Sequence, residues 1–360
     1  MPPPEDWPAS TPREHAGGEA IVSLRRQVSS VGDGKEFVIC IDGSSTGDRG
    51  VRLAAMLMKE RDRLSIVTVP AKGDRSDDSK GLLASAESYA RHIGLRGPQI
   101  STEVVSLKDG WTLPGAIIHL ANHRQGAVVV MGAAGRGAES AAKTSGNRPH
   151  GQPPMGSVAK EVMERCKVPV ILVKAVAIPQ LDKTDLHLRD RRTGEVSLKI
   201  CCTIDGTTLS QKAFDTALHL CRSCDTLTVV HVDDSDQAVI HAVSEGQTHS
   251  MQQSLSTLAA VRSYYENECS KAEIGIPGLR TRLVVAHKVG SIRETVLDTT
   301  EGVCDVMVMG STTMSKGQGN AGGGTSVGST PRLFLGSVAA AIAKQSSYHA
   351  CVIKGYTGLI

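Results

Sequence analysis

The sequence predicts an α/β fold in which a doubly wound domain, with a parallel sheet covered by helices on both faces, occurs twice along the chain. Two observations carry this prediction. Four blocks of sequence recur in the same order in both halves, and short apolar runs alternate with segments of helical periodicity. The length of 360 residues suits two domains of about 150 residues each, and a 40% share of apolar residues is enough to fill both cores.

The first strand of each half is an apolar run that ends in Asp, Gly and two hydroxyl residues. Residues 37–45 (FVICIDGSS) recur as residues 200–208 (ICCTIDGTT). Twenty residues after each Asp, the second strand is expected in residues 62–69 (DRLSIVTV) and 225–232 (DTLTVVHV). Apolar residues at helical spacing predict the intervening helices at 51–58 and 213–220.

The last two strands of each half enclose a short helix. The fourth strand is expected at 127–132 (AVVVMG) and 305–310 (DVMVMG), and the final strand at 169–174 and 350–354. The helix before each final strand starts at a Gly-Ser-Val-Ala sequence, at 156–159 and 336–339. From the Gly of this sequence to the Lys that ends the final strand there are 18 positions in both halves. This order of matched blocks is typical of a duplicated domain.

Composition argues against several classes of function. The formal charge of +3 gives no support for a polyanion-binding surface, and 3% aromatic residues are too few for base-stacking platforms, so no nucleic-acid partner is expected. No apolar stretch is long enough for a transmembrane helix, so no membrane partner is expected either. The first twenty residues lack the apolar segment of a secretory signal, and nine cysteines, mostly in apolar runs, indicate reduced thiols in a cytoplasmic protein. The scattered histidines form no HExxH motif, so no histidine metal centre is expected.

Asp42 and Asp205 follow the first strand of each half, where the carboxyl ends of parallel strands form the ligand crevice of an open sheet. A carboxylate at this place can accept hydrogen bonds from nucleoside hydroxyls or amines. An Asx-turn that opens the strand-to-helix loop explains the same residues without a ligand. The two interpretations are balanced, because the Asp recurs in both halves.

Glycines follow the fourth strand of the first half in the sequence Met131-Gly132-Ala-Ala-Gly135. Glycine lets the backbone approach a phosphate closely. Gly156 and Ser157 open a helix whose first amides are donors at the positive end of its dipole, and Ser157 is expected to be the N-cap. The full set favours phosphate binding, and the alternative is that these residues only turn the chain and cap the helix.

The Asp-Gly-Ser turn, the Met-Gly-x-x-Gly sequence and the Gly-Ser-Val helix start before Pro-Val-Ile-Leu-Val-Lys together resemble the universal stress protein (UspA-like) family, in tandem. The resemblance implies two Rossmann-like domains of flavodoxin type, similar to adenine nucleotide alpha hydrolases, each with a parallel five-stranded sheet. The expected arrangement is a disordered tail at 1–34, domain 1 at 35–175 with an insertion at about 138–154, a linker at 176–196, and domain 2 at 197–356 with an insertion at about 314–331.

The resemblance also implies an ATP site. In the first half the glycines and Ser157 would hold the phosphates, while Asp42 and the backbone near Val69 would flank ribose and adenine. The expected binding residues are Asp42, Val69, Met131, Gly132, Gly135, Gly156, Ser157 and Val158, with weaker counterparts Asp205, Val232, Gly310, Gly336 and Ser337 in the second half. Ser157 is the expected protein ligand of a Mg²⁺ ion that accompanies ATP.

Departures from the family pattern separate the two halves. Twenty residues lie between Gly135 and Gly156, more than in the family pattern, but a longer loop costs little and leaves the cradle intact. In the second half, Thr313 stands where the second Gly is expected, and its Cβ disfavours a positive φ and a close approach to phosphate. One competent site, in domain 1, is therefore expected.

The sequence thus predicts a cytoplasmic tandem stress-response protein that binds an adenine nucleotide in domain 1. Two alternatives stay open, a nucleotide-independent scaffold that acts through dimer contacts and a slow nucleotide hydrolase on the same fold, and no catalytic residue is assigned. The final strands are apolar edges, so they are expected to join the two halves as an intrachain pseudo-dimer. Pairing of whole chains into a homodimer is left open.

Overall fold

The computed structural model describes residues 34–70, 76–108, 110–124, 126–135, 137, 155–174, 197–233, 248–312, 314–315, 333–334 and 336–355. The chain divides into residues 1–34 and residues 35–360, and the second unit contains the fold. The tail before Gly34, the linker, the first insertion, most of the second insertion and Thr313 lie outside the described residues.

Strands and helices alternate in both halves. The elements of the first half are β1 (Glu36–Cys40), α2 (Ser45–Leu57), β2 (Arg63–Thr68), α3 (Ser76–His92), the short 3-10 helix η2 (Gly97–Gln99), β3 (Ile100–Val104), α4 (Leu113–Asn122), β4 (Ala127–Gly132), α6 (Ser157–Arg165) and β5 (Val170–Val173). Those of the second half are β6 (Lys199–Ile204), α7 (Thr208–Leu220), β7 (Thr226–Asp233), α9 (Thr248–Gly275), β8 (Arg280–His287), α10 (Ile292–Thr300), β9 (Val306–Thr312), α11 (Ser337–Gln345) and β12 (His349–Gly355). A two-stranded ladder of β10 (Met314–Ser315) and β11 (Leu333–Phe334) stands apart from the main sheet.

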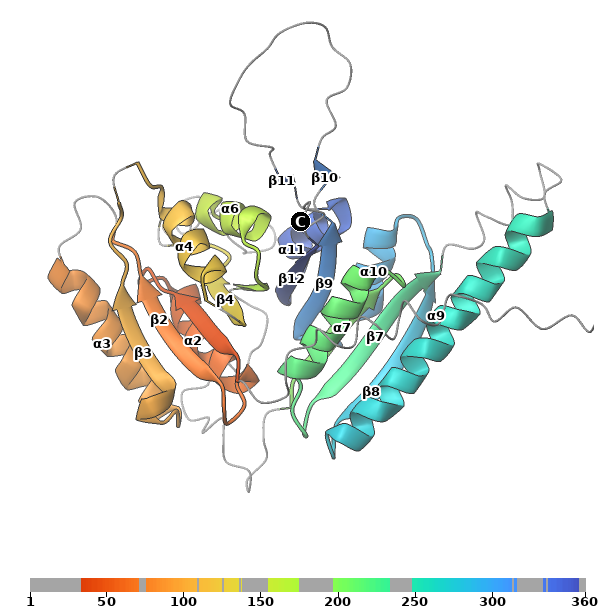
Figure 1. The fold of residues 1–360 in the computed structure, drawn as a ribbon, viewed down its shortest axis with the longest axis horizontal. Coiled ribbons are helices and arrows are strands. Elements are labelled where there is room, and N and C mark those ends of the chain that lie inside the picture. Colours follow the sequence, from red (N-terminus) through yellow and green to blue (C-terminus); the bar gives the residue numbers. More distant parts are fainter. Residues whose placement is uncertain are drawn as a thin grey trace, which may run out of the picture. The chain divides into compact units, whose positions relative to one another are not determined.

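The strands form one ten-stranded sheet in the order β3-β2-β1-β4-β5-β12-β9-β6-β7-β8, so each half contributes five parallel strands as predicted (Figure 1). Within each half this is the Rossmann order 3-2-1-4-5. A flavodoxin-type sheet has the order 2-1-3-4-5, so that part of the expectation is wrong. The reason is that the chain adds β2 and β3 on one side of β1 and then crosses to the other side for β4. The switch point of the first half therefore lies between β1 and β4.

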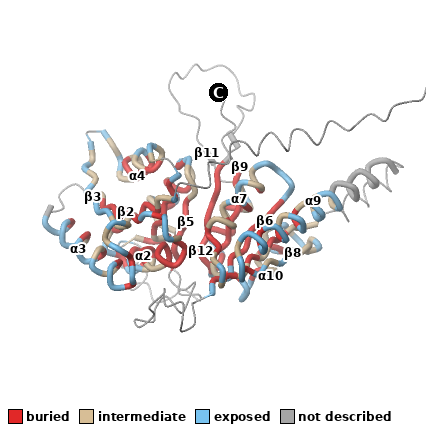
Figure 2. The backbone as a smooth tube through the Cα atoms, turned by 60° about the horizontal axis from the view of Figure 1, so that its bottom comes forward, coloured by how far each residue is buried: buried red, intermediate tan, exposed pale blue. Residues whose placement is uncertain are grey.

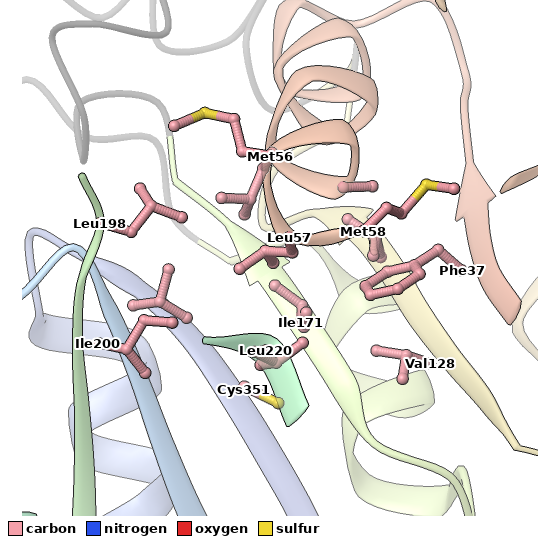
Figure 3. Packing of buried hydrophobic residues seen from close by; sticks show 14 of the residues in the cluster. Phe37, Met56, Leu57, Met58, Val128, Ile171, Leu198, Ile200, Leu220 and Cys351 are labelled. Atoms are coloured by element: carbon pink, nitrogen blue, oxygen red, sulfur yellow. The ribbon is translucent and has the colours of Figure 1, made fainter. Parts of the chain in front are cut away.

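The two halves meet at their final strands. β5 pairs antiparallel with β12, with Ile171 opposite Cys351, which is the strand contact expected for a pseudo-dimer. Buried residues of both halves belong to one hydrophobic core along this seam. Figure 2 shows β5 and β12 coloured as buried. Figure 3 shows Leu57 of α2 and Ile171 of β5 close to Leu220 of α7 and Cys351 of β12. These side chains are fully buried, so the seam is a hydrophobic core and not a polar contact between separate domains.

The lysine that ends each final strand crosses the seam to a helix of the other half. The Lys174 ammonium donates to the carbonyl of Ala343 in α11, and the Lys354 ammonium donates to the carbonyl of Glu164 in α6 at 2.6 Å. These carbonyls belong to the last turns of the two helices, which lack intrahelical partners. Burial lowers the pKa of each ammonium to about 8. The 18-residue spacing of the repeat thus supplies two reciprocal helix caps.

Among the described residues, no helix combines the length and the apolar character needed to cross a membrane.

Candidate functional site

A cavity of about 720 Å³ opens at the carboxyl ends of β1, β2 and β4, at the switch point of the first half. This volume is in the range of pockets that hold small ligands and cofactors. All eight binding residues expected in the first half line this cavity: Asp42, Val69, Met131, Gly132, Gly135, Gly156, Ser157 and Val158. The structure therefore brings together residues that are up to 116 positions apart in the sequence, from Asp42 to Val158.

One wall of the cavity is apolar. It contains Val69, which follows β2, and Met131, near the end of β4. The wall is completed by Leu82 of α3 and by Leu113 and Ile117 of α4. A flat heteroaromatic ring is the kind of ligand group that such a wall accepts, because apolar side chains remove its faces from water. The sequence analysis missed the contributions of α3 and α4, since these helices carry no motif.

Asp42 lines the cavity, and its carboxylate makes the turn considered for it. One carboxylate oxygen accepts a hydrogen bond from the amide of Ser44 at 3.0 Å, which is the Asx-turn of the alternative interpretation. The other oxygen lies beside Gly135, where an added Cβ would approach it to 2.7 Å. The turn fixes the carboxylate at the cavity wall, where a ligand hydroxyl could donate to it.

The loop after β4 needs glycine because of close contacts, and not because of a positive φ. A Cβ on Gly132 would lie 2.9 Å from the Thr46 Cβ, and a Cβ on Gly135 would collide with Asp42. Neither glycine has a positive φ. Thr313 was expected to be unfavourable partly because it disfavours a positive φ. That reason is wrong, since its counterpart Gly135 does not adopt one. Steric closeness alone sets the requirement.

The hydroxyl of Thr46 holds this loop in place through a hydrogen bond. Its Oγ1 donates to the carbonyl of Ala134 at 2.7 Å, and it lies 3.2 Å from the hydroxyl of Ser44. Thr46 and Ser44 are both buried. A buried polar pair of this kind holds a loop in one conformation, because breaking it leaves groups without partners. Sequence reasoning did not single out Thr46.

Helix α6 presents its amino end to the cavity. Its N-cap is Gly156, and Ser157 is the first helical residue, so the expectation that Ser157 is the N-cap is wrong. The amide of Gly156 donates to the Ala133 carbonyl at 2.8 Å, which ties the helix start to the glycine loop, and the N-cap makes no side-chain hydrogen bond to the first turn. The Ser157 side chain is exposed and lines the cavity. Its hydroxyl is thus placed for a ligand, beside helix amides that attract anions.

The charged side chains of the described lining are carboxylates. Asp42 and Asp78 line the cavity, and no Lys or Arg is found among its described lining residues. A polyphosphate at this place would therefore need a cation. Hydroxyl oxygens suit Mg²⁺, so Ser157, which lines the cavity, has the chemistry to share such an ion with phosphate oxygens.

The second half has the same frame with different contacts. Asp205 accepts hydrogen bonds from the amide and the hydroxyl of Thr207, at 3.0 and 2.6 Å. A Cβ on Gly310 would lie 2.8 Å from Cγ of Leu209, which takes the place of Thr46. The amide of Gly336, the N-cap of α11, donates to the Ser311 hydroxyl at 2.9 Å. Ser337 begins α11, and Val232 lies near the end of β7, so all five expected residues keep equivalent positions.

Comparison with known proteins gives one family. The family model described as "Universal stress protein family" matches residues 35–174 and again residues 198–354. A search of curated proteins finds no significant relative.

One solved structure supports the fold over most of the chain. A universal stress protein from Archaeoglobus fulgidus DSM 4304 superposes with a TM-score of 0.51 at 15% identity, over 89% of this chain and 97% of that chain. The universal stress protein UspA from Lactobacillus plantarum covers 44% of this chain and 99% of its own length, at 16% identity and a TM-score of 0.29. A universal stress protein in complex with cAMP covers 39% of this chain and 97% of its own length, at 23% identity and a TM-score of 0.28.

The two family matches coincide with the two five-stranded halves of the sheet, and the first of them contains the cavity. The chain belongs to the universal stress protein family.

Proposed function

We propose that the first half binds an adenine nucleotide, ATP with Mg²⁺, as part of a cytoplasmic stress response. The observation that carries this proposal is the cavity of about 720 Å³, into which all eight expected binding residues converge. Family membership supports the stress-related role. The presence of nine free thiols supports a reducing compartment.

Three parts of the cavity match three parts of the ligand. The apolar wall with Val69, Leu113 and Ile117 suits the adenine ring, and the Asp42 carboxylate suits the ribose hydroxyls. The glycine loop and the first turn of α6 supply backbone amides for phosphate oxygens. A bound Mg²⁺ would neutralise phosphate charge, with the Ser157 hydroxyl as its protein ligand.

We assign binding rather than efficient turnover. One oxygen of Asp42 is held in the Asx-turn, and its carboxylate is accounted for by the turn and the ribose. Slow Mg²⁺-assisted hydrolysis and a nucleotide-independent scaffold are the alternatives to be separated by experiment.

The test uses the full chain purified without added nucleotide. Acid denaturation followed by ion-exchange chromatography should release an adenine nucleotide, and calorimetric titration of nucleotide-free protein with Mg-ATP should give one site per chain. Accumulation of ADP or AMP during incubation would favour the hydrolase. No released nucleotide and no calorimetric signal would favour the scaffold and overturn the proposal. Light scattering of the same sample tests the homodimer.

A further inference from the structure

Two imidazoles lie against each other at the carboxyl end of α4, away from the nucleotide cavity. His119 is in the last turn of this helix and His123 is its C-cap. Their ring centroids are 4.0 Å apart, and both side chains are exposed. Residues four positions apart on a helix are neighbours on one face. His123 keeps this position although it is the C-cap, because its amide still donates to the His119 carbonyl at 3.3 Å. A search for HExxH does not detect this spacing.

The orientation of His123 is fixed by a second contact to the same carbonyl. Its Nδ1 lies 2.7 Å from the carbonyl oxygen of His119. A carbonyl only accepts, so Nδ1 carries the proton and Nε2 keeps its lone pair. Histidines that bind metals are commonly oriented in this way, with one ring nitrogen donating to a backbone carbonyl and the other facing the metal.

His119 is held from its other side by Trp111. The two rings meet edge to face, with centroids 4.6 Å apart at an angle of 73°. The ammonium of Lys108 lies 5.3 Å from the centroid of the Trp111 ring. A metal binds the two imidazoles only in their neutral form.

We propose that His119 and His123 chelate a late first-row divalent cation such as Ni²⁺, Cu²⁺ or Zn²⁺, with water completing the coordination shell. Imidazole suits these metals, whereas Mg²⁺ and Ca²⁺ prefer oxygen ligands. The described residues contain no group of three or more His, Cys, Asp or Glu side chains that could hold a metal ion. Two protein ligands are fewer than the three or four of zinc proteins, so the ion exchanges readily.

Binding would join the last turn of α4 to its C-cap. The same helix contributes Leu113 and Ile117 to the wall of the nucleotide cavity. The metal site therefore lies on a different face of an element that shapes that wall, and it does not depend on the proposed nucleotide function.

Ni²⁺ is the probe of choice, because it does not oxidise thiols and quenches the fluorescence of a nearby indole. Trp111 and Trp7 are the two tryptophans of the chain, so a Trp7→Phe background reports on Trp111 alone. Titration with Ni²⁺ at pH 7.5 should quench this fluorescence with saturation at one ion per chain, checked by calorimetry. His119→Ala and His123→Ala should each raise the midpoint by about 10-fold or more. Protons compete with the metal for imidazole nitrogens, so acidification to about pH 5 should abolish the quenching.

His92→Ala is the matched control, since His92 is an exposed histidine in the last turn of α3, and it should leave the midpoint unchanged. Circular dichroism of each variant verifies that α4 and the rest of the fold persist. The proposal is overturned if either single His variant keeps the parental midpoint, if quenching persists at pH 5, or if saturation is not reached below about 1 mM, the range of adventitious contacts.

Discussion

The two halves of the sheet share a fold and five equivalent crevice residues, yet they differ in what supports the loop after the fourth strand. In the first half, Thr46 donates a hydrogen bond to the Ala134 carbonyl, and its side chain lies against Gly132. In the second half the same position holds Leu209, whose side chain lies against Gly310. A polar support that fixes a loop has thus been exchanged for an apolar contact. The comparison predicts that the frame of the site and its ability to bind are separate properties.

The amide at the start of the following helix shows a related difference. Gly156 donates to a backbone carbonyl, that of Ala133, whereas Gly336 donates to the side chain of Ser311. Both arrangements tie the helix to the loop. In the first half backbone atoms alone make this hydrogen bond, whereas in the second half it depends on the Ser311 hydroxyl.

The largest effect is expected from Gly135→Val. Its branched side chain would occupy the space of the Asp42 carboxylate, because even a Cβ would approach the carboxylate oxygen to 2.7 Å. We expect nucleotide affinity to fall by more than about 100-fold, measured by calorimetry. Gly336→Val, at the N-cap of α11, changes a crevice glycine of the second half and should leave the affinity unaltered. Gly81→Ala controls for backbone effects, since a Cβ there meets nothing within 4 Å. Loss of binding in Gly336→Val together with retained binding in Gly135→Val would contradict this prediction and place the site in the second half.

Thr46→Val tests the polar support and should have the next largest effect. The substitution keeps the shape but leaves the buried Ala134 carbonyl without its partner, at a cost of about 1–3 kcal/mol. We expect nucleotide affinity to fall by about 10-fold, since about 1.4 kcal/mol corresponds to that factor. Thr46→Ser keeps the hydroxyl and should restore most of the affinity. If Ser and Val behave alike, the hydroxyl has no part in shaping the loop.

Much of this comparison could be predicted from the sequence, and the reason lies in burial. β1, β2, β4 and β5 are buried on both faces and therefore appear as apolar runs, as does β6 in the second half, whereas β7 is only partly buried. The edge strand β3 is exposed along most of its length, so no such run marks it. Asp42 and the glycines were detectable because their chemistry and spacing are specific. Leu113 and Ile117 were not, because only the tertiary fold brings α4 over the cavity.

A third difference between the halves concerns histidine at the seam. His349 begins β12, where the first half has Pro169, and its Nδ1 accepts from the Lys174 amide at 3.0 Å. Burial, followed by the charges of Lys174 and Arg49, lowers the pKa of His349 to about 3. The folded state therefore binds fewer protons than the unfolded state, whose histidine has a pKa of about 6.5. The stability that the neutral His349 contributes is complete above about pH 6.5 and is lost as the pH falls toward 3.

Urea unfolding at pH 7.0 and pH 5.5 checks this prediction. His349 should contribute a loss of about 1.4 kcal/mol per pH unit below 6.5. His349→Gln should reduce the difference between the two pH values by this share, whatever other groups titrate. An unchanged difference in the variant would mean that His349 does not sense the pH.

The smallest effect is expected from the reciprocal lysine caps, and it distinguishes a symmetric seam from an asymmetric one. Lys174→Met and Lys354→Met each remove a donor from a helix-end carbonyl of the other half and should each cost about 1 kcal/mol of unfolding free energy at pH 7. Because burial lowers the folded pKa of both lysines to about 8, the folded state releases its protons before the unfolded state does. The wild-type lysines therefore stabilise the fold more as the pH rises from 8 toward 10.5, and both substitutions should cost more unfolding free energy at pH 9.5 than at pH 7.

Lys212→Met, at an exposed lysine of α7, should show neither the cost nor its pH dependence. Equal costs for the two caps would mean that the duplicated halves stabilise each other equally. A cost confined to one lysine would show that the repeat preserves the spacing of the caps but not their energy.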